Sequence, residues 1–187
     1  MFDELEVRSL RPAWLVSVIS NGLALFAVIW LIAAVFSAEA HAFEIEGSGT
    51  VYRAVDGDTY WVSNIEPAVY QALLAESRNR DHFNDRYRSV KIRLGAVDTA
   101  ESVHADAAKN TLRGQSISEH MKRVSKDQQA RFRCWDVGRY GRPICSISLS
   151  NIGDIGLYLI RNQFSDYVTH WGSHPFMDGA YRSAAAR

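Results

Sequence analysis

The 187-residue sequence predicts an α+β domain that is built mainly from short strands. Two kinds of pattern lead to this fold class. Several short runs alternate apolar and polar side chains, which is typical of half-buried strands, and other segments repeat apolar residues at helical spacing. Hydrophobic residues make up 47% of the chain and aromatic residues 11%, which is enough to fill a core and excludes a disordered chain.

An uncharged, hydrophobic segment, residues 13–36, comes first along the chain. Two arginines precede it and acidic residues follow it, so the positive-inside rule keeps the N-terminus in the cytoplasm. Either the segment spans a membrane as a single-pass helix, or it belongs to a signal peptide that is cleaved at the A-H-A sequence of Ala40–Ala42. Both interpretations separate residues 1–42 from an exported domain, residues 43–187. We expect this domain in the periplasm, secreted, or anchored in the inner membrane and facing out of the cytoplasm.

Residues 44–62 predict a β-hairpin. Two strand-like runs flank the turn D-G-D-T at Asp56–Thr59, and Asp-Gly between such runs is a strong signal for a tight turn. A plain turn accounts for the first aspartate. The second, Asp58, stands where a strand begins, so its side chain is expected to have a fixed position.

Residues 64–89 interrupt the strand pattern. Pro67–Glu76 predicts a short helix with proline in its first turn, and a charged, irregular stretch follows it. We interpret residues 64–89 as an insertion into the domain. Its arginines are typical of a solvated face, because aspartates dilute their charge, and a phosphate-facing patch is the less favoured alternative.

The stretch Arg93–Glu101 reads R-L-G-A-V-D-T-A-E. It starts in a third strand, in which apolar residues at positions 90, 92 and 94 alternate with charged ones. It ends in a turn that is expected to place Asp98 beside Glu101. Two carboxylates and the guanidinium of Arg93 are costly at such close range unless a cation or an anionic substrate compensates them.

The rest of the chain predicts a helix at residues 115–124, strands at Ala130–Asp136 and Pro143–Leu149, a helix at residues 151–164, and an amphipathic stretch at residues 175–187. The order is therefore three strands, a helix, two strands and further helices. Five short strands with a helix after the third is the plan of an OB-fold, a β-barrel that often binds oligonucleotides. We expect a five-stranded OB-fold barrel with about three helices, preceded by the N-terminal hydrophobic helix.

Both cysteines of the chain flank one predicted turn. Cys134 and Cys145 stand on either side of a segment that contains Gly138 and Gly141, so a hairpin there places them opposite each other. A cysteine pair in an exported domain is typical of a disulfide. Two buried free thiols are the alternative.

Charge alone does not predict a nucleic-acid-binding protein. The chain has a formal net charge of zero, and residues 43–187 carry only +2 because residues 1–42 hold two more acidic than basic residues. That balance is too mild to attract a polyanion through bulk electrostatics. Any phosphate binding must therefore be local.

Three separate motifs together resemble those of one nuclease family. D-G-D-T at Asp56–Thr59, the stretch Arg93–Glu101 and R-Y-G-R at Arg139–Arg142 occur in the order, and around the strand pattern, of the thermonuclease (staphylococcal nuclease-like) family. The resemblance covers residues 49–164. It implies an OB-fold enzyme that hydrolyses phosphodiester bonds.

The resemblance implies a calcium site. Asp58 and Asp98 match carboxylate ligands of Ca²⁺, and Thr99 matches a residue that contributes its backbone carbonyl. Glu101 matches the residue that positions or deprotonates the attacking water. Carboxylate, carbonyl and water oxygens are the ligands that Ca²⁺ prefers, so the residue types agree with this role.

The resemblance also implies a phosphate site. Arg93 and Arg142 match two arginines that hold the scissile phosphate, and planar guanidinium groups meet phosphate oxygens in pairs better than lysine does. Arg139 and Tyr140 match residues that contact the terminal phosphate of a bound nucleotide.

Three features depart from the family pattern. The family often has T-P-E where this chain has T-A-E, and the loss of proline at position 100 is expected to loosen the placement of Glu101. Gly138 stands where an acidic residue is frequent. The tyrosine that stacks on the base has no clear match, and Tyr167 and Trp171 are the candidates.

We therefore expect a calcium-dependent, monomeric phosphodiesterase that cuts DNA and RNA with low sequence specificity outside the cytoplasm. One alternative is an OB-fold module that binds nucleic acid or a protein without cleaving. Another is a component of an envelope assembly, anchored in the membrane by residues 13–36 if they are uncleaved and docking through residues 64–89. The sequence contains no Ser-His-Asp triad pattern, P-loop or dinucleotide fingerprint.

Overall fold

The structure is a computed structural model that describes residues 43–187, with the exception of residues 103–107 and 109. Residues 13–36, and with them both interpretations of the hydrophobic segment, lie outside the described residues. In the part of the chain that is described, no helix is both long enough and apolar enough to cross a membrane.

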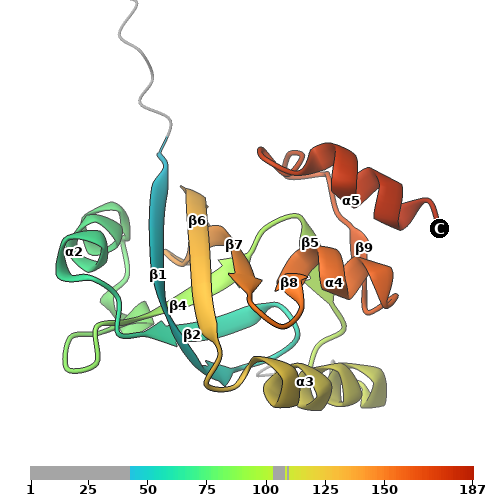
Figure 1. Ribbon diagram of the computed structural model, residues 1–187, viewed down its shortest axis with the longest axis horizontal. Helices are drawn as coiled ribbons and strands as arrows, with labels where there is room; N and C mark the ends of the chain where they lie inside the picture. The colour runs from blue at the N-terminus through green and yellow to red at the C-terminus, as the bar shows by residue number, and fades with distance from the viewer. Residues whose placement is uncertain (1–42, 103–107, 109) are drawn as a thin grey trace, which may run out of the picture. The chain divides into compact units, whose positions relative to one another are not determined.

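The α+β fold class predicted from the sequence is confirmed. Seven strands form one sheet in the order β3-β4-β2-β1-β6-β7-β8, and β5 pairs with β9 in a second, two-stranded sheet (Figure 1). The strands are β1 Ile45–Ala54, β2 Thr59–Ser63, β3 Phe83–Asn84, β4 Ser89–Leu94, β5 Val97–Thr99, β6 Gln129–Val137, β7 Pro143–Leu149, β8 Gly153–Asp154 and β9 Ser165–Tyr167. The predicted strands correspond to β1, β2, β4, β6 and β7. The other four are only two or three residues long, which is too short for an alternating pattern to reveal them.

One further pairing joins two strands that are distant in the sheet order. β4 also pairs with β7, in parallel, with Arg93 opposite Ile144 and Leu94 opposite Cys145. The other pairings of these strands are antiparallel. The hydrogen-bonded order β4-β2-β1-β6-β7 therefore returns to β4.

The predicted helices are present, α2 with the predicted bounds and the others with shifted ends. They are α2 Pro67–Glu76, α3 Leu112–Ser125, α4 Ile155–Arg161 and α5 Asp178–Ala185. Helix α3 begins earlier than predicted because the side chain of Thr111 caps its first turn by accepting a hydrogen bond from the Gly114 amide. Helix α4 is shorter than predicted because the residues before it pair with β7, and Asp154 caps its start.

The core lies on the inner face of the sheet. Four fully buried residues of β2 and β4 alternate with half-buried ones; they are Tyr60, Val62, Val90 and Ile92. The half-buried side chains between them consequently point to the outer face. This alternation places Arg93, the residue before the last one of β4, outside the core.

The predicted disulfide is present between Cys134 on β6 and Cys145 on β7. The two residues are directly opposite each other in the antiparallel register of these strands, and both are fully buried. The bridge therefore closes the hairpin that carries the R-Y-G-R motif at its turn.

Reducing this disulfide is expected to lower the free energy of unfolding by about 3 kcal/mol, because the unfolded chain regains the freedom of the closed loop. Urea denaturation with and without dithiothreitol measures the change. The double variant Cys134→Ala/Cys145→Ala is the control, since its stability should not respond to dithiothreitol. An equal response in both proteins would contradict a stabilising bridge.

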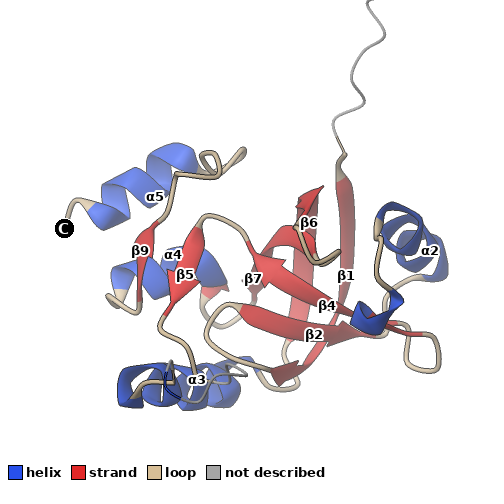
Figure 2. Cartoon of the chain, turned by 180° about the vertical axis from the view of Figure 1, so that it is seen from behind, coloured by secondary structure: helices blue, strands red, loops and turns tan. Residues whose placement is uncertain are grey.

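Helices α4 and α5 pack with β5 and β9 at one end of the sheet, as both views show (Figures 1 and 2). The hydroxyl of Tyr181 on α5 donates a 2.6 Å hydrogen bond to Asp154, the capping residue of α4. His174, before α5, is 1% exposed, and its Nδ1 accepts hydrogen bonds from the amides of Phe176 and Met177. Because Nδ1 accepts, the neutral ring carries its proton on Nε2.

His174 is expected to make the protein less stable in mild acid. Burial lowers the pKa of His174, and this outweighs the opposing charges of Asp154 and Asp178. The folded state thus binds fewer protons than the unfolded state, so stability falls as the pH drops below the ordinary histidine pKa. His174→Asn keeps an acceptor near the position of Nδ1 and cannot be charged. Urea denaturation at pH 7.5 and pH 5 should show a smaller acid-induced loss for this variant than for the wild type, and equal losses would contradict the assignment.

Candidate functional site

Asp58 is the central residue of the candidate site. It follows the hairpin turn and precedes β2, and its side chain is only 2% exposed. Gly57 allows this turn to approach β5, because a Cβ atom at this position would lie 2.7 Å from the side chain of Thr99. The turn of the D-G-D-T motif therefore places the carboxylate of Asp58 in contact with β5.

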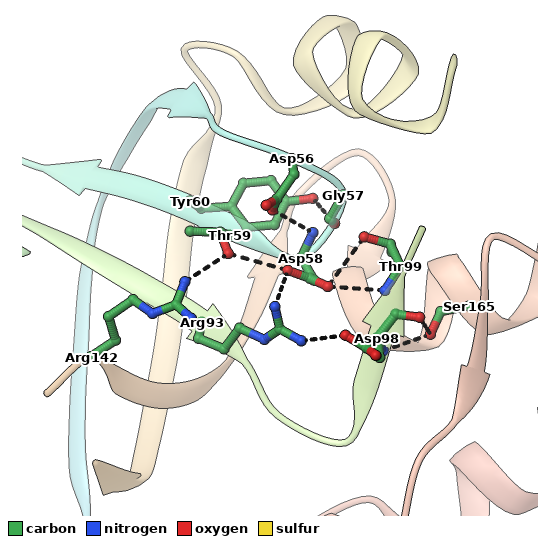
Figure 3. Close-up of polar contacts among 10 residues, drawn as sticks. All are labelled: Asp56, Gly57, Asp58, Thr59, Tyr60, Arg93, Asp98, Thr99, Arg142 and Ser165. Atoms are coloured by element: carbon green, nitrogen blue, oxygen red, sulfur yellow. Dashed lines mark hydrogen bonds and ion pairs between the residues drawn. The ribbon is translucent and has the colours of Figure 1, made fainter. Parts of the chain in front are cut away.

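Four donors satisfy the buried carboxylate of Asp58 (Figure 3). Its Oδ2 accepts from the backbone amide of Thr99 at 2.9 Å and from the Thr99 hydroxyl at 3.1 Å. Its Oδ1 accepts from the Thr59 hydroxyl at 3.1 Å and from Arg93 at 2.7 Å. Burial raises the pKa of Asp58 to about 6, although Arg93 acts in the opposite direction. A carboxylate with this environment is costly to keep charged unless a cation stays beside it.

Arg93 joins the two aspartates that the sequence predicted to share a site. One terminal nitrogen donates to Asp58 at 2.7 Å and the other to Asp98 at 2.6 Å, so the guanidinium lies between the two carboxylates (Figure 3). Burial tends to lower the pKa of Arg93, but the two carboxylates outweigh it and the pKa rises above its usual value. Asp98 is the more accessible partner, with a side chain that is 51% exposed.

Arg142 lies beside Arg93 and reaches the same turn. It donates to the hydroxyl of Thr59 at 3.3 Å, and Thr59 in turn donates to Asp58 (Figure 3). Burial and the neighbouring charge of Arg93 lower the pKa of Arg142. Among the described residues Arg142 has no carboxylate within 4 Å, so its charge is not neutralised by an ion pair.

Glu101 lies within electrostatic range of Arg142. Its negative charge acts to raise the pKa of Arg142, although less strongly than burial and Arg93 lower it. The backbone of Glu101 is held by Thr111, whose amide donates to the Glu101 carbonyl at 3.0 Å, and by close packing against Gly114 of α3. The contact with α3 therefore fixes the backbone of Glu101, although alanine and not proline stands at position 100.

Sequence reasoning missed the residue that supports Asp98. Ser165 on β9 accepts a 2.9 Å hydrogen bond from the Asp98 amide and donates to the Asp98 carbonyl at 3.1 Å (Figure 3). In the β5–β9 register Ser165 is opposite Thr99, the residue that follows Asp98. A serine in a three-residue strand carries no sequence signal, because such a strand is too short to be recognised.

Arg139 and Tyr140 are exposed at the turn between β6 and β7, and Tyr140 is 68% exposed. The described contacts of Asp58 and Arg93 do not include either residue. The structure thus leaves both side chains accessible beside Arg142, and does not join them to the two aspartates.

The insertion holds this turn in place, which the sequence did not predict. The hydroxyl of Ser77 donates to the carbonyl of Gly141, and the ring of His82 lies 2.9 Å from the carbonyl of Tyr140. Gly141 has φ +79° and packs against Asn79, so a side chain there would be both strained and obstructed. Residues 64–89 therefore fix the backbone directly before Arg142.

The two candidates for base stacking differ in accessibility. Tyr167 donates to Asp178 at 2.6 Å, accepts from the His174 amide and packs against Tyr181, so it belongs to the C-terminal packing. Trp171 is 77% exposed and is the accessible one of the two.

The donor types around Arg93 suit a hard cation such as Ca²⁺, since Asp58 and Asp98 both offer carboxylate oxygens. Their number is small, however. No group of three or more His, Cys, Asp or Glu residues that could hold a metal occurs among the residues described. A Ca²⁺ ion here would draw most of its ligands from backbone carbonyls, water or a substrate phosphate.

The chain was compared with known proteins. No protein-family model matches it, and no curated protein matches it.

Arg93→Gln is expected to lower the free energy of unfolding by about 3 kcal/mol, because the buried charge of Asp58 loses its compensating cation. Asp98→Asn should cost less than about 1 kcal/mol, because Asp98 is half exposed and its ion pair with Arg93 is solvated. Urea denaturation of the full-length chain at pH 7 measures both values.

A double variant separates charge from packing. Asp58→Asn in the Arg93→Gln background should restore part of the lost stability, because it removes the uncompensated buried charge. If Arg93→Gln and Asp98→Asn proved equally mild, Arg93 would not be the cation on which Asp58 depends.

Proposed function

We propose that this protein is a calcium-dependent phosphodiesterase that hydrolyses DNA and RNA with low sequence specificity. The observation that carries the proposal is the convergence of three distant motifs: Asp58, Arg93 with Asp98, and Arg142 meet around the hydroxyl and amide groups of Thr59 and Thr99. The resemblance of these motifs to those of the thermonuclease family supports the same activity.

The proposed fold is a five-stranded OB-fold barrel with an insertion at residues 64–89. The return of the pairing order from β7 to β4 supports this, since a barrel requires the first and last strands to pair. In OB-folds the ligand face lies on the outside of the strands, which is where Arg93 and Arg142 are found.

Two guanidinium groups bind the phosphate in the proposed mechanism. Arg142 has no ion-pair partner in the described part of the chain, so it is ready to accept an anion. Arg93 uses both terminal nitrogens for carboxylates, so it must exchange one of them for a phosphate oxygen. Asp98 is the partner that it gives up, because Asp98 is exposed whereas Asp58 is buried.

Glu101 acts on the attacking water. The described hydrogen bonds of Asp58 and Asp98 do not involve the Glu101 carboxylate, and its charge acts on Arg142. It therefore orients the water or removes its proton as a general base. A Ca²⁺ ion held by Asp58, Asp98 and the Thr99 carbonyl would polarise the phosphate and favour ionisation of the water.

The proposed location is outside the cytoplasm. The disulfide supports this, because such bonds persist in oxidising compartments. The soluble domain is proposed to act as a monomer, either released or tethered by residues 13–36.

A second candidate is a binding module that uses the same surface without cleaving. One observation favours it: every oxygen of Asp58 is already engaged by donors within the protein, and Arg93 takes the place between the aspartates where a cation is proposed. Binding of nucleic acid that persists in chelator, without cleavage in Ca²⁺, would identify this alternative.

Arg142→Gln is expected to lower kcat for hydrolysis of denatured DNA by about 10²–10³-fold, as the loss of one preorganised donor does at other sites that stabilise developing charge. Release of acid-soluble nucleotides by the full-length chain in millimolar Ca²⁺ measures the rate. Arg161→Gln, an exposed charge change on α4, is the matched control and should keep the wild-type rate.

Removal of Ca²⁺ should abolish the same activity. EGTA should stop the release of nucleotides, and added Ca²⁺ should restore it. In a separate calorimetric titration, Asp58→Asn and Asp98→Asn should weaken Ca²⁺ binding. A wild-type protein that fails to cleave denatured DNA in Ca²⁺ would refute the proposed enzyme.

A further inference from the structure

The outer face of β1, β2 and β4 carries a row of aromatic and basic side chains. Arg53 is opposite Trp61 in the β1–β2 register, and Trp61 is opposite Lys91 in the β2–β4 register. Their neighbours Tyr60 and Ile92 are fully buried, so these three side chains point away from the core. One row of outward-facing side chains therefore crosses three strands, with Arg53 exposed and Trp61 and Lys91 half-buried.

This row adjoins the candidate site. Thr59 and Arg93, which are opposite each other in the same register, stand two residues along from Trp61 and Lys91 and therefore lie on the same face. Arg142, in the turn directly before β7, donates to the Thr59 hydroxyl. The phosphate-binding residues and the aromatic row are consequently successive rows of one surface.

At its far end the row opens into a groove beside α3. The groove has a volume of about 330 Å³ and is lined by Tyr52, Arg53, Ala54, Val55, Lys122 and Lys126. Arg53 belongs to both the row and the groove. Tyr52 is 39% exposed, and its ring centroid lies 6.2 Å from that of Trp61. Figure 1 shows α3 beside the end of β1 from which these residues come.

Among the described residues, no ion pair neutralises the cations along this surface. Burial lowers the pKa of Lys91, and the charge of Arg142 lowers it further, against the opposing effect of Asp56. Arg53 adds a smaller lowering effect. Within the described residues, neither Arg53 nor Lys91, Lys122 or Lys126 forms an ion pair. Positive charge therefore continues from Arg142 across the face to α3, and a chain of anions would relieve the repulsion.

The side-chain types identify the occupant. A row of lysine and arginine tracks the phosphates of a nucleic acid, and exposed tryptophan and tyrosine rings stack on unpaired bases of any sequence. Bases in a duplex are already stacked on each other and do not offer their faces to such rings. Among polyanions, a single strand is the one that uses both the charges and the rings.

We propose that the row Arg53–Trp61–Lys91 and the groove at Lys122 and Lys126 form a track for single-stranded nucleic acid that leads away from the Arg93–Arg142 site. The inference rests on the proposed phosphodiesterase function and adds to it the preferred substrate: a single strand long enough to reach the groove, roughly four nucleotides or more.

The first arm of the test measures binding without cleavage. Fluorescence anisotropy in EGTA follows the binding of a 20-nucleotide oligo(dT) to the full-length chain at several salt concentrations. The triple variant Arg53→Gln/Lys122→Gln/Lys126→Gln removes exposed charges of the track. Arg86→Gln/Arg161→Gln/Arg187→Gln removes three exposed charges that belong neither to the row nor to the groove, and is the matched control.

The track variant should bind at least about 10-fold more weakly, and its slope of log affinity against log salt should be shallower by about 2, since each lost phosphate contact reduces the slope by about 0.7 for a single strand. The control triple should keep the wild-type slope. Trp61→Ala should lose about 10-fold in affinity with little change in slope, and Trp61→Phe should recover most of it because stacking remains.

The second arm measures cleavage of a trinucleotide and of the 20-nucleotide strand in Ca²⁺. The track variant should cleave the trinucleotide at the wild-type rate, with a raised KM only for the long strand. Equal binding by the track and control triples, or wild-type binding of a duplex as tight as that of the single strand, overturns the track. A wild type that binds oligo(dT) through the track but cleaves nothing overturns the proposed enzyme and leaves the track standing.

Discussion

The buried carboxylate of Asp58 is the constraint on which the candidate site depends. A charge that is removed from water in this way must be met by donors, and here they come from Thr59 beside it, Thr99 on β5 and Arg93 on β4. Each donor fixes a different segment of the chain relative to the hairpin turn. The hydrogen bonds that the buried Asp58 requires therefore fix the position of Arg93. Arg93 in turn holds the side chain of Asp98 through its second ion pair.

The remaining parts of the site are supported by elements that surround the five long strands. The β9 strand holds Asp98 through Ser165, α3 holds the backbone of Glu101, and the insertion holds the turn before Arg142. These three supports lie in segments that are distant from the motifs in sequence. The insertion is thus a structural support for the R-Y-G-R turn as well as an exposed surface.

The charge of this protein is neutral in sum and uneven in detail. Arg93 is neutralised by two carboxylates, whereas Arg142 and Lys91 beside it have no ion pair among the described residues. Compensated charge therefore lies at the proposed cation site, and uncompensated positive charge lies on the outer face next to it. A near-neutral domain can in this way attract a polyanion locally, where bulk charge would not.

Sequence alone determined the α+β class, the five long strands and the helix at Pro67–Glu76, because alternation and proline act locally along the chain. It favoured a disulfide over two free thiols, and the structure contains the disulfide. It also predicted that Asp58, Arg93, Asp98 and Arg142 share a site, and the structure brings these four residues close together. Only the tertiary structure decided that Arg93 lies between the aspartates, that Ser165 supports Asp98, and that the strand ends and α3 create a groove at Lys122 and Lys126. These features depend on which strands pair and in what register, and no local pattern records contacts between residues so far apart.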